Sequence, residues 1–159
     1  GYPVRGIIKD ELLYLRNYYT DRWPAGNPET GYLNCDGGAT KTYILNQRRI
    51  HGNMEYWELN FGKRVAEELY HIKVDPYCMN NLTDNCFYES KLEALRDEMK
   101  SRLTEQGDPR ILGRGEVFMT YPYAQSNRGL YEKLMSGQEV NTGWVYDSDF
   151  EPEWVNVPE

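Results

Sequence analysis

Apolar and polar positions alternate in the first twenty residues of the chain. Residues 4–8 and 11–19 are rich in β-branched and aromatic side chains, and Lys9 and Asp10 separate them. This pattern predicts a β-hairpin. Both faces of the second segment carry apolar side chains, so we expect that strand to be central in a sheet or covered on both sides.

The most regular helical period falls between residues 84 and 105. Apolar residues recur there at spacings of three and four: Leu92, Leu95, Met99 and Leu103. This spacing predicts an amphipathic helix, with Thr83 or Asp84 as its N-cap. The Gly-Asp-Pro sequence at residues 107–109 is expected to end it.

Shorter elements follow from weaker patterns: a helix over residues 39–49, a second helix over 53–61 capped by Asn53, a strand over 67–72, and one or two helical turns over 130–138. Ile44 and Leu45 are expected to face inward in the first of these helices. Tyr56, Trp57 and Phe61 are expected to pack in the second.

Two long segments lack a regular period. Residues 20–38 contain two prolines and four glycines, and a loop of this length is usually functional or disordered. Its aromatic residues Trp23 and Tyr32 favour packing over disorder. Residues 144–159 are acidic with scattered aromatic side chains, and we expect this tail to lie along the surface of a body or to stay mobile.

Composition limits the classes of function. With 159 residues the chain fits one domain, or one domain and a tail, and its 14 tyrosines supply much of the apolar mass. Because tyrosine prefers one hydrated end, we expect a thin core and a broad, half-exposed aromatic surface, as in a piece that packs on something larger. The net charge of −7 argues against a nucleic-acid partner. No apolar run approaches the roughly 20 residues that span a membrane.

The cysteines and histidines do not indicate a metal site. The spacing of Cys35, Cys78 and Cys86 fits neither a zinc site nor a disulfide framework. We therefore expect free thiols, with a pair between Cys78 and Cys86 as the alternative. His51 and His71 have no ordered pattern of carboxylates beside them.

The segment GGATKT, residues 37–42, is similar to an incomplete phosphate-binding loop. A P-loop requires a glycine before its lysine, and Thr40 stands there before Lys41. The sequence therefore disfavours a nucleotide site but permits a more general anion site at the start of the predicted helix, with an ordinary helix cap as the alternative. His51 follows two arginines at the other end of this helix, and either binds an anion or simply ends the helix.

No catalytic apparatus is evident from the residues alone. Carboxylates are abundant, as at residues 67–68 and 147–151, but paired acids hydrolyse glycosides only at defined separations, which a sequence does not give. A solvated acidic face is the default interpretation. Neither a G-x-S-x-G motif nor a supported cysteine–histidine pair is present.

Three motifs occur in a defined order: Val4-Arg5-Gly6 with Tyr14-Leu15-Arg16-Asn17 in the hairpin, Glu68-Leu69-Tyr70-His71-Ile72 in the later strand, and Asp75-Pro76 with Asn81-Leu82 before the long helix. This order resembles the C-terminal subdomain of the type I (formylglycine) sulfatases of the alkaline phosphatase-like superfamily. The chain departs from that pattern at His71, where the family usually has Asp, and at Cys78, where it often has Glu. Within the family it looks most similar to bacterial enzymes of the heparan N-sulfatase (sulfamidase) kind.

The resemblance implies an α+β fold, in which a small antiparallel sheet of about four strands packs against the long helix and an irregular tail follows. It implies a sulfatase subdomain at residues 1–107 and an irregular C-terminal extension of the same structural unit at residues 108–159. The chain is then a C-terminal fragment that completes the fold of a larger enzyme and lines its substrate cleft.

The resemblance also implies what the chain lacks. Sulfatases use a formylglycine made from the Cys or Ser of a C/S-x-P/A-x-R motif, and a calcium ion held by Asp and Asn, all in the N-terminal domain. None of the three cysteines lies in that motif, so we expect no catalytic or metal-binding residue here and no activity of the fragment alone. The parent enzyme is expected to be periplasmic or secreted and to hydrolyse sulfate esters or N-sulfates on a glycosaminoglycan-type carbohydrate.

The candidate substrate-binding residues lie on or beside the long loop: Arg22, Asp36, Thr40, Lys41 and His51. The expected partners are the N-terminal sulfatase domain of the same chain and the sulfated carbohydrate, with no nucleic acid and no membrane span. Two alternatives stay open. One is a stand-alone carbohydrate-binding module that stacks sugars on Trp23, Tyr32 and Trp57, and the other is the corresponding subdomain of a related phosphohydrolase.

Overall fold

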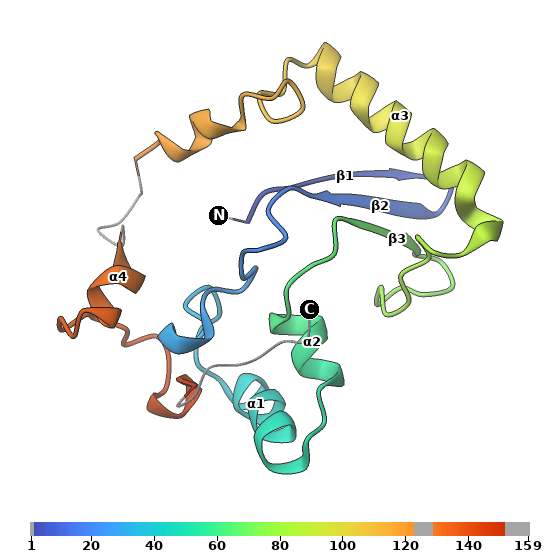
Figure 1. Ribbon diagram of the computed structural model, residues 1–159. Coiled ribbons are helices and arrows are strands. Elements are labelled where there is room, and N and C mark those ends of the chain that lie inside the picture. The colour runs from blue at the N-terminus through green and yellow to red at the C-terminus, as the bar shows by residue number, and fades with distance from the viewer. Residues whose placement is uncertain (1, 123–128, 152–159) are drawn as a thin grey trace. The chain divides into compact units, whose positions relative to one another are not determined.

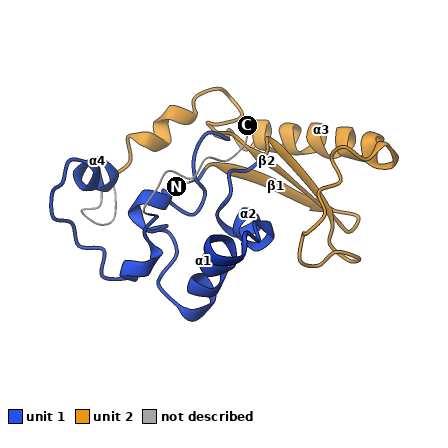
Figure 2. Ribbon diagram, turned by 60° about the horizontal axis from the view of Figure 1, so that its bottom comes forward, with its two compact units in different colours: residues 1–2, 20–64, 125–159 blue, residues 3–19, 65–124 orange. Residues whose placement is uncertain are grey.

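The computed structural model describes residues 2–122 and 129–151 (Figure 1). The chain divides into two compact units (Figure 2). Unit 1 comprises residues 1–2, 20–64 and 125–159, and unit 2 comprises residues 3–19 and 65–124. Neither unit is continuous in sequence, and the boundary predicted between residues 107 and 108 stays a prediction.

Unit 2 contains the sheet. Its strands β1 (Val4–Lys9), β2 (Leu12–Asn17) and β3 (Glu67–His71) pair antiparallel in the order β1-β2-β3, so the predicted central position of β2 is confirmed. The hairpin turn is made by Asp10 and Glu11, which both have positive φ as a two-residue hairpin turn requires. Within the described residues the sheet has three strands, not the four that the resemblance implied.

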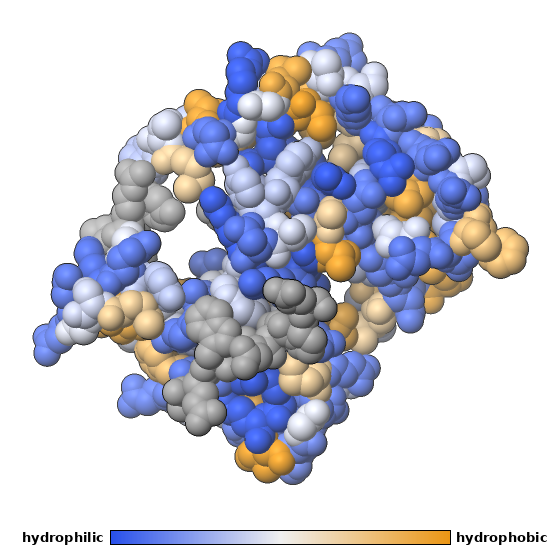
Figure 3. Space-filling view, viewed as in Figure 1, coloured by the Kyte–Doolittle hydropathy of each residue, from blue (hydrophilic) through white to orange (hydrophobic). Residues whose placement is uncertain are grey.

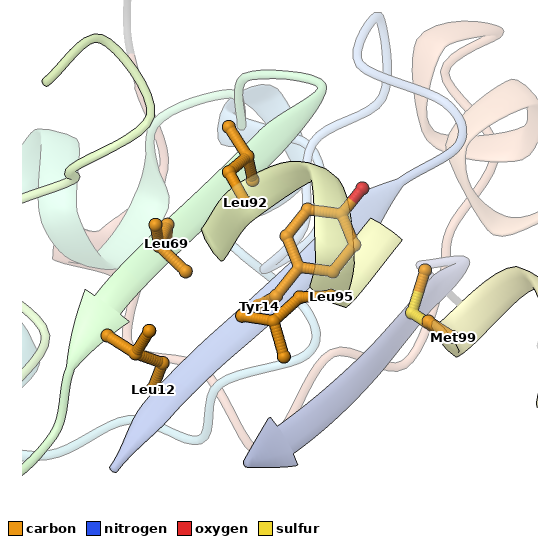
Figure 4. Close-up of a cluster of buried hydrophobic side chains, with 6 residues drawn as sticks. All are labelled: Leu12, Tyr14, Leu69, Leu92, Leu95 and Met99. Carbon is orange, nitrogen blue, oxygen red and sulfur yellow. The ribbon is translucent and has the colours of Figure 1, made fainter. Parts of the chain in front are cut away.

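The helix α3 (Glu89–Glu105) packs on one face of β1 and β2, which confirms the predicted α+β arrangement. Alternate residues of β2 point to this face, and α3 presents residues three and four apart to it. The buried cluster consists of Leu12, Tyr14, Leu69, Leu92, Leu95 and Met99 (Figure 4). Burying one such side chain contributes about 1.5–3 kcal/mol, so this cluster is the main stabilising element of unit 2.

The start of α3 differs from the prediction. A short 3₁₀ helix (Cys86–Tyr88) precedes it, and the side chain of Asn85, not Thr83 or Asp84, accepts the capping hydrogen bond from the amide of Phe87. The amide of Leu82 still donates to the carbonyl of Leu69 (2.8 Å). This bond ties the preceding residues to β3, and the helix begins later than the sequence pattern suggested.

The connector after β3 is held by side chains. The Asp75 carboxylate accepts hydrogen bonds from the amides of Met79 (3.0 Å) and Asn80 (2.8 Å), which together hold its pKa below the ordinary value. Asn81 accepts from the amide of Leu69 (2.9 Å) and donates to the carbonyl of Glu67. These bonds cover part of the free edge of β3, which an unpaired strand would otherwise leave open.

Unit 1 is built from helices α1 (Ala39–His51), α2 (Glu55–Phe61) and α4 (Leu130–Met135) with irregular segments. Its buried cluster consists of Ala25, Tyr32, Ile44, Leu45, Trp57 and Phe61. The predicted inward positions of Ile44, Leu45, Trp57 and Phe61 are confirmed. Tyr56 is 44% exposed, so its predicted packing is wrong.

The described part of the tail is anchored to the rest of unit 1. The indole of Trp144 donates to the carbonyl of Leu33 (2.9 Å), and Val145 and Asp149 are buried. Residues 146–148 are exposed, so residues 144–151 lie along the surface of unit 1, as one of the two expectations for the tail had it, with Asp149 as a buried anchor. Residues 152–159 lie outside the described residues.

The surface agrees with the composition. Hydrophilic residues dominate the face drawn in Figure 3, as expected from a mean hydropathy of −0.79. The three cysteines are free thiols, as predicted. Among the described residues, no helix combines the length and apolar character that a membrane span requires.

Candidate functional site

The predicted substrate-binding residues all lie in unit 1, but they do not form one site. Arg22 is half-buried in the long loop, while Asp36 and Thr40 are exposed near the start of α1. His51 is exposed at the other end of α1. Eleven residues of helix rise separate Thr40 from His51, which places them about 17 Å apart along the axis. A substrate role for these residues stays a prediction.

Lys41 has a structural use inside unit 1. Only 6% of this residue is exposed. Its ammonium donates to the carbonyls of Gly31 (2.7 Å) and Cys35 (2.8 Å) and forms an ion pair with Asp149 (3.2 Å). Three donors thus meet three partners. The ammonium has none left for a substrate anion at the start of α1.

A second polar cluster of unit 1 surrounds Glu151. Its carboxylate accepts from the hydroxyl of Tyr32 (2.5 Å) and pairs with Arg48 (2.5 Å) and Arg49 (3.2 Å). Burial acts to raise the pKa of Glu151, but these hydrogen bonds outweigh burial and lower it. Burial and the nearby Glu151 raise the pKa of Tyr32. Both groups are therefore fixed in their ordinary protonation states, as suits a structural network.

The same cluster argues against the sugar-stacking alternative. Tyr32 and Trp57 are fully buried, and the Trp57 indole donates to the Tyr32 hydroxyl (2.9 Å). Neither ring presents a face to a ligand. Of the three rings proposed for stacking, only Trp23 is even partly exposed.

A pocket in unit 2 brings four charged side chains together and is a candidate binding site. It has a volume of about 350 Å³ and lies between β2, β3, α3 and the segment after α3. It is lined by Tyr14, Arg16, Tyr18, Glu67, Arg96, Met99, Lys100 and Ile111. Three of these side chains are cations and one is a carboxylate, within a protein of net charge −7.

Glu67 is the centre of the polar wall of this pocket. Arg96 binds it with a two-pronged contact, Nε to Oε1 and Nη2 to Oε2, each 2.9 Å. The hydroxyl of Tyr14 donates to Oε1 (2.5 Å), and Nη1 of Arg16 lies 3.4 Å from the same oxygen. The hydrogen bonds from Arg96 first, and then that from Tyr14, hold the pKa of Glu67 at about 2 against the opposing effect of burial.

These groups are suited to binding and not to proton transfer. Burial, and then the hydrogen bond to Glu67, raise the pKa of Tyr14 to about 12. Glu67 therefore stays ionised and Tyr14 stays neutral across the physiological range, and a general acid or base needs a pKa near the working pH. The described residues contain no group of three or more His, Cys, Asp or Glu side chains arranged to hold a metal ion.

The sequence analysis missed this pocket although one signal pointed to it. Alternation along β2 places Tyr14 and Arg16 on the same face, and the antiparallel register pairs Arg16 with Glu67. The missing information was the register itself and the rotation of α3, which bring Arg96 and Lys100 to that face. Neither can be read from the spacing of the motifs.

Comparison with curated proteins finds a distant similarity to the ulvan-active sulfatase of Formosa agariphila. The two are 28% identical over 119 residues, which make up 72% of this chain and 19% of that protein. The similarity supports a relationship to sulfatases, and the chain matches only about a fifth of the relative's length. No protein-family model matches the chain, and no solved structure matches it significantly.

Proposed function

We propose that this chain is the non-catalytic C-terminal part of a sulfatase-type hydrolase that acts on a sulfated carbohydrate. The observation that supports the proposal is the 119-residue similarity to a sulfatase whose name gives ulvan as its substrate. The proposed reaction is hydrolysis of a sulfate ester or an N-sulfate. The heparan N-sulfatase-like motifs of the sequence are the reason for retaining the N-sulfate.

The residues of this chain do not fit the cofactors of such an enzyme. A formylglycine requires a modification motif, and Cys35, Cys78 and Cys86 are followed by unrelated sequences. A calcium ion requires several converging oxygen ligands, and the described residues offer no cluster of that kind. We therefore assign both groups to an N-terminal catalytic domain and derive no chemical step within this chain.

The chain's own contribution is structural and substrate-facing. The sheet of unit 2 and the helices of unit 1 complete the fold, and the exposed loop and helix ends line one wall of the cleft. Arg22, Asp36, Thr40 and His51 are the residues proposed for that wall. Lys41 acts indirectly, since it anchors the loop through the carbonyls of Gly31 and Cys35.

The test begins with the gene sequence upstream of the codon for Gly1. The proposal expects a coding region that contains a C/S-x-P/A-x-R motif. The protein encoded by that region together with these 159 residues, called the joined chain below, is then expected to hydrolyse an aryl sulfate and a sulfated polysaccharide. The joined chain with the Cys or Ser of the motif changed to Ala is expected to be inactive. The 159-residue chain alone is expected to show no turnover.

Two outcomes would contradict this proposal. Turnover of the aryl sulfate by the chain alone would show that a catalytic centre lies within it. Turnover of an aryl phosphate but not of an aryl sulfate by the joined chain would favour the related phosphohydrolase instead.

A further inference from the structure

The pocket of unit 2 holds more positive charge than its carboxylate requires. The fork of Arg96 already neutralises Glu67, yet Arg16 and Lys100 line the same pocket. Like charges that share a cavity repel one another, and the repulsion is strongest where water is partly excluded. An anion bound in the pocket would remove this cost.

Two cationic side chains of the pocket keep part of their surface open to solvent. Arg96 binds Glu67 through Nε and Nη2 and also interacts with Tyr14, yet its side chain is 42% exposed. Lys100 is exposed and has no ion pair within the described residues. Guanidinium and ammonium groups form strong, charge-assisted hydrogen bonds with oxyanions such as sulfate and carboxylate.

The remaining lining is aromatic and apolar. Its accessible part comes from Tyr18 and Ile111, which are partly exposed, since Tyr14 and Met99 are buried in the core cluster. Such side chains match the C–H faces of a sugar ring better than they match a bare inorganic ion. The volume of about 350 Å³ falls in the range of roughly 300–1,000 Å³ that is usual for small-molecule sites.

We propose that this pocket binds the sulfate or carboxylate group of an acidic sugar. Arg96 and Lys100 hold the oxyanion, Arg16 adds positive charge, and the partly exposed Tyr18 and Ile111 contact the sugar. The oxyanion is inferred from the pocket itself, whereas the sugar rests on the proposed function. The site lies in a different unit from residues 22–51 and needs no catalytic domain to form.

Isothermal titration calorimetry of the full 159-residue chain tests this at constant ionic strength. The probes are glucose 6-sulfate, glucuronate, inorganic sulfate and glucose. Saturable binding is expected for at least one acidic sugar, weaker binding for inorganic sulfate and none for glucose, and the first two probes distinguish sulfate from carboxylate. No binding of either acidic sugar to the folded chain, or equal binding of glucose, would overturn the proposal.

A pair of lysine variants locates the site. Lys100→Ala is expected to weaken binding by about fivefold or more, because a charge-assisted contact is lost. Lys91→Ala removes the same charge from an exposed position on the same helix, outside this pocket, and is expected to change binding by less than about twofold. Equal weakening by both variants would contradict the assignment to this pocket.

The two proposals fail separately. The titration measures binding by this chain, whereas the sulfatase test measures turnover by the joined chain. If the joined chain hydrolysed the sulfate but this chain bound no acidic sugar, only the pocket assignment would be wrong. If this chain bound the sugar but the joined chain showed no turnover, only the sulfatase assignment would be wrong.

Discussion

The two units use charged side chains in opposite ways. In unit 1 the paired charges are buried: the side chains of Lys41 and Asp149 are 5% and 0% exposed, and that of Glu151 is 3% exposed between two arginines. In unit 2 the pocket arginines are 41% and 42% exposed around a single carboxylate. Buried charge pairs fix a fold, whereas half-exposed cations remain accessible to a ligand.

This difference shows that burial and pairing, not residue type, separate a binding cation from a structural one. Lys41 lies in the first turn of α1 after two glycines, and its sequence context permits an anion site. Its ammonium nevertheless already donates to two carbonyl oxygens and pairs with a carboxylate. Lys100 lies in an ordinary amphipathic helix, yet it lines a pocket of half-exposed cations.

The largest expected effect comes from breaking the buried pair in unit 1. Lys41→Met leaves Asp149 buried without its counter-charge, at an expected cost of about 3–5 kcal/mol in the free energy of unfolding. Urea unfolding followed by tryptophan fluorescence measures it, because the described tryptophans Trp23, Trp57 and Trp144 all lie in unit 1.

Two further variants control for this result. The exposed Lys133→Met in the same unit is expected to change stability by less than about 0.5 kcal/mol. The double variant Lys41→Met/Asp149→Leu is expected to recover most of the loss, since it removes both charges. A single Lys41 variant as stable as the wild type would contradict the structural role of the pair.

The next effect concerns a single hydroxyl in the same unit. Tyr32→Phe removes the bond to Glu151 and leaves the indole N–H of Trp57 buried without its acceptor. We expect a loss of about 2–3 kcal/mol in the free energy of unfolding, again measured by fluorescence. A loss below about 0.5 kcal/mol would show that the cluster around Glu151 does not stabilise unit 1.

A pH-dependent effect tests the polar wall of unit 2. Because the folded-state pKa of Glu67 is about 2, below its usual value of 4.5, its contribution to stability is present above about pH 4.5 and is lost as the pH falls towards 2. Allowing for solvent screening, this contribution is about 1–2 kcal/mol. The difference in stability between wild type and Glu67→Gln should therefore shrink over that interval.

Amide hydrogen exchange in β3 and α3 at a series of pH values measures this difference locally. Glu93→Gln, at an exposed position of the same helix, serves as the matched control. If the Glu67 difference stayed constant from pH 5 to pH 2, the strong pairing with Arg96 would be excluded.

The smallest expected effect has the opposite sign. The buried hydroxyl of Tyr18 has no hydrogen-bond partner within the described residues. Tyr18→Phe is therefore expected to be neutral or to stabilise unit 2 by up to about 1 kcal/mol, in contrast to Tyr32→Phe. Hydrogen exchange in β2 measures it, and a clear loss of protection would reveal an undetected partner of that hydroxyl.

The predictable part of the fold was the part set by local periodicity. Alternation predicted the hairpin of β1 and β2, and the three–four spacing of Leu92, Leu95 and Met99 predicted α3. The start of α3 was missed because a short 3₁₀ helix capped by Asn85 precedes it. The buried anchor of the tail was not predicted, because Asp149 pairs with a lysine more than 100 residues away.

The candidate site was less predictable than the fold. The sequence pattern alone selected Lys41 as a candidate substrate-binding residue. Only the tertiary structure shows that its ammonium already pairs with Asp149. The pocket joins Arg16, Glu67 and Arg96 from three elements, so its recognition requires the strand register and the rotation of α3. A sequence shows which residues share one face of a single helix or strand. A binding site also depends on which of these faces pack against one another.

The most direct test of this account is a residue-by-residue titration. ¹H–¹⁵N correlation spectra of the isotope-labelled chain would be recorded with increasing glucose 6-sulfate at constant ionic strength. The account predicts that the largest shifts cluster in β2, β3 and α3 around Arg16, Arg96 and Lys100. Largest shifts at residues 36–41, or at His51, would instead place the available positive charge in unit 1 and contradict the account.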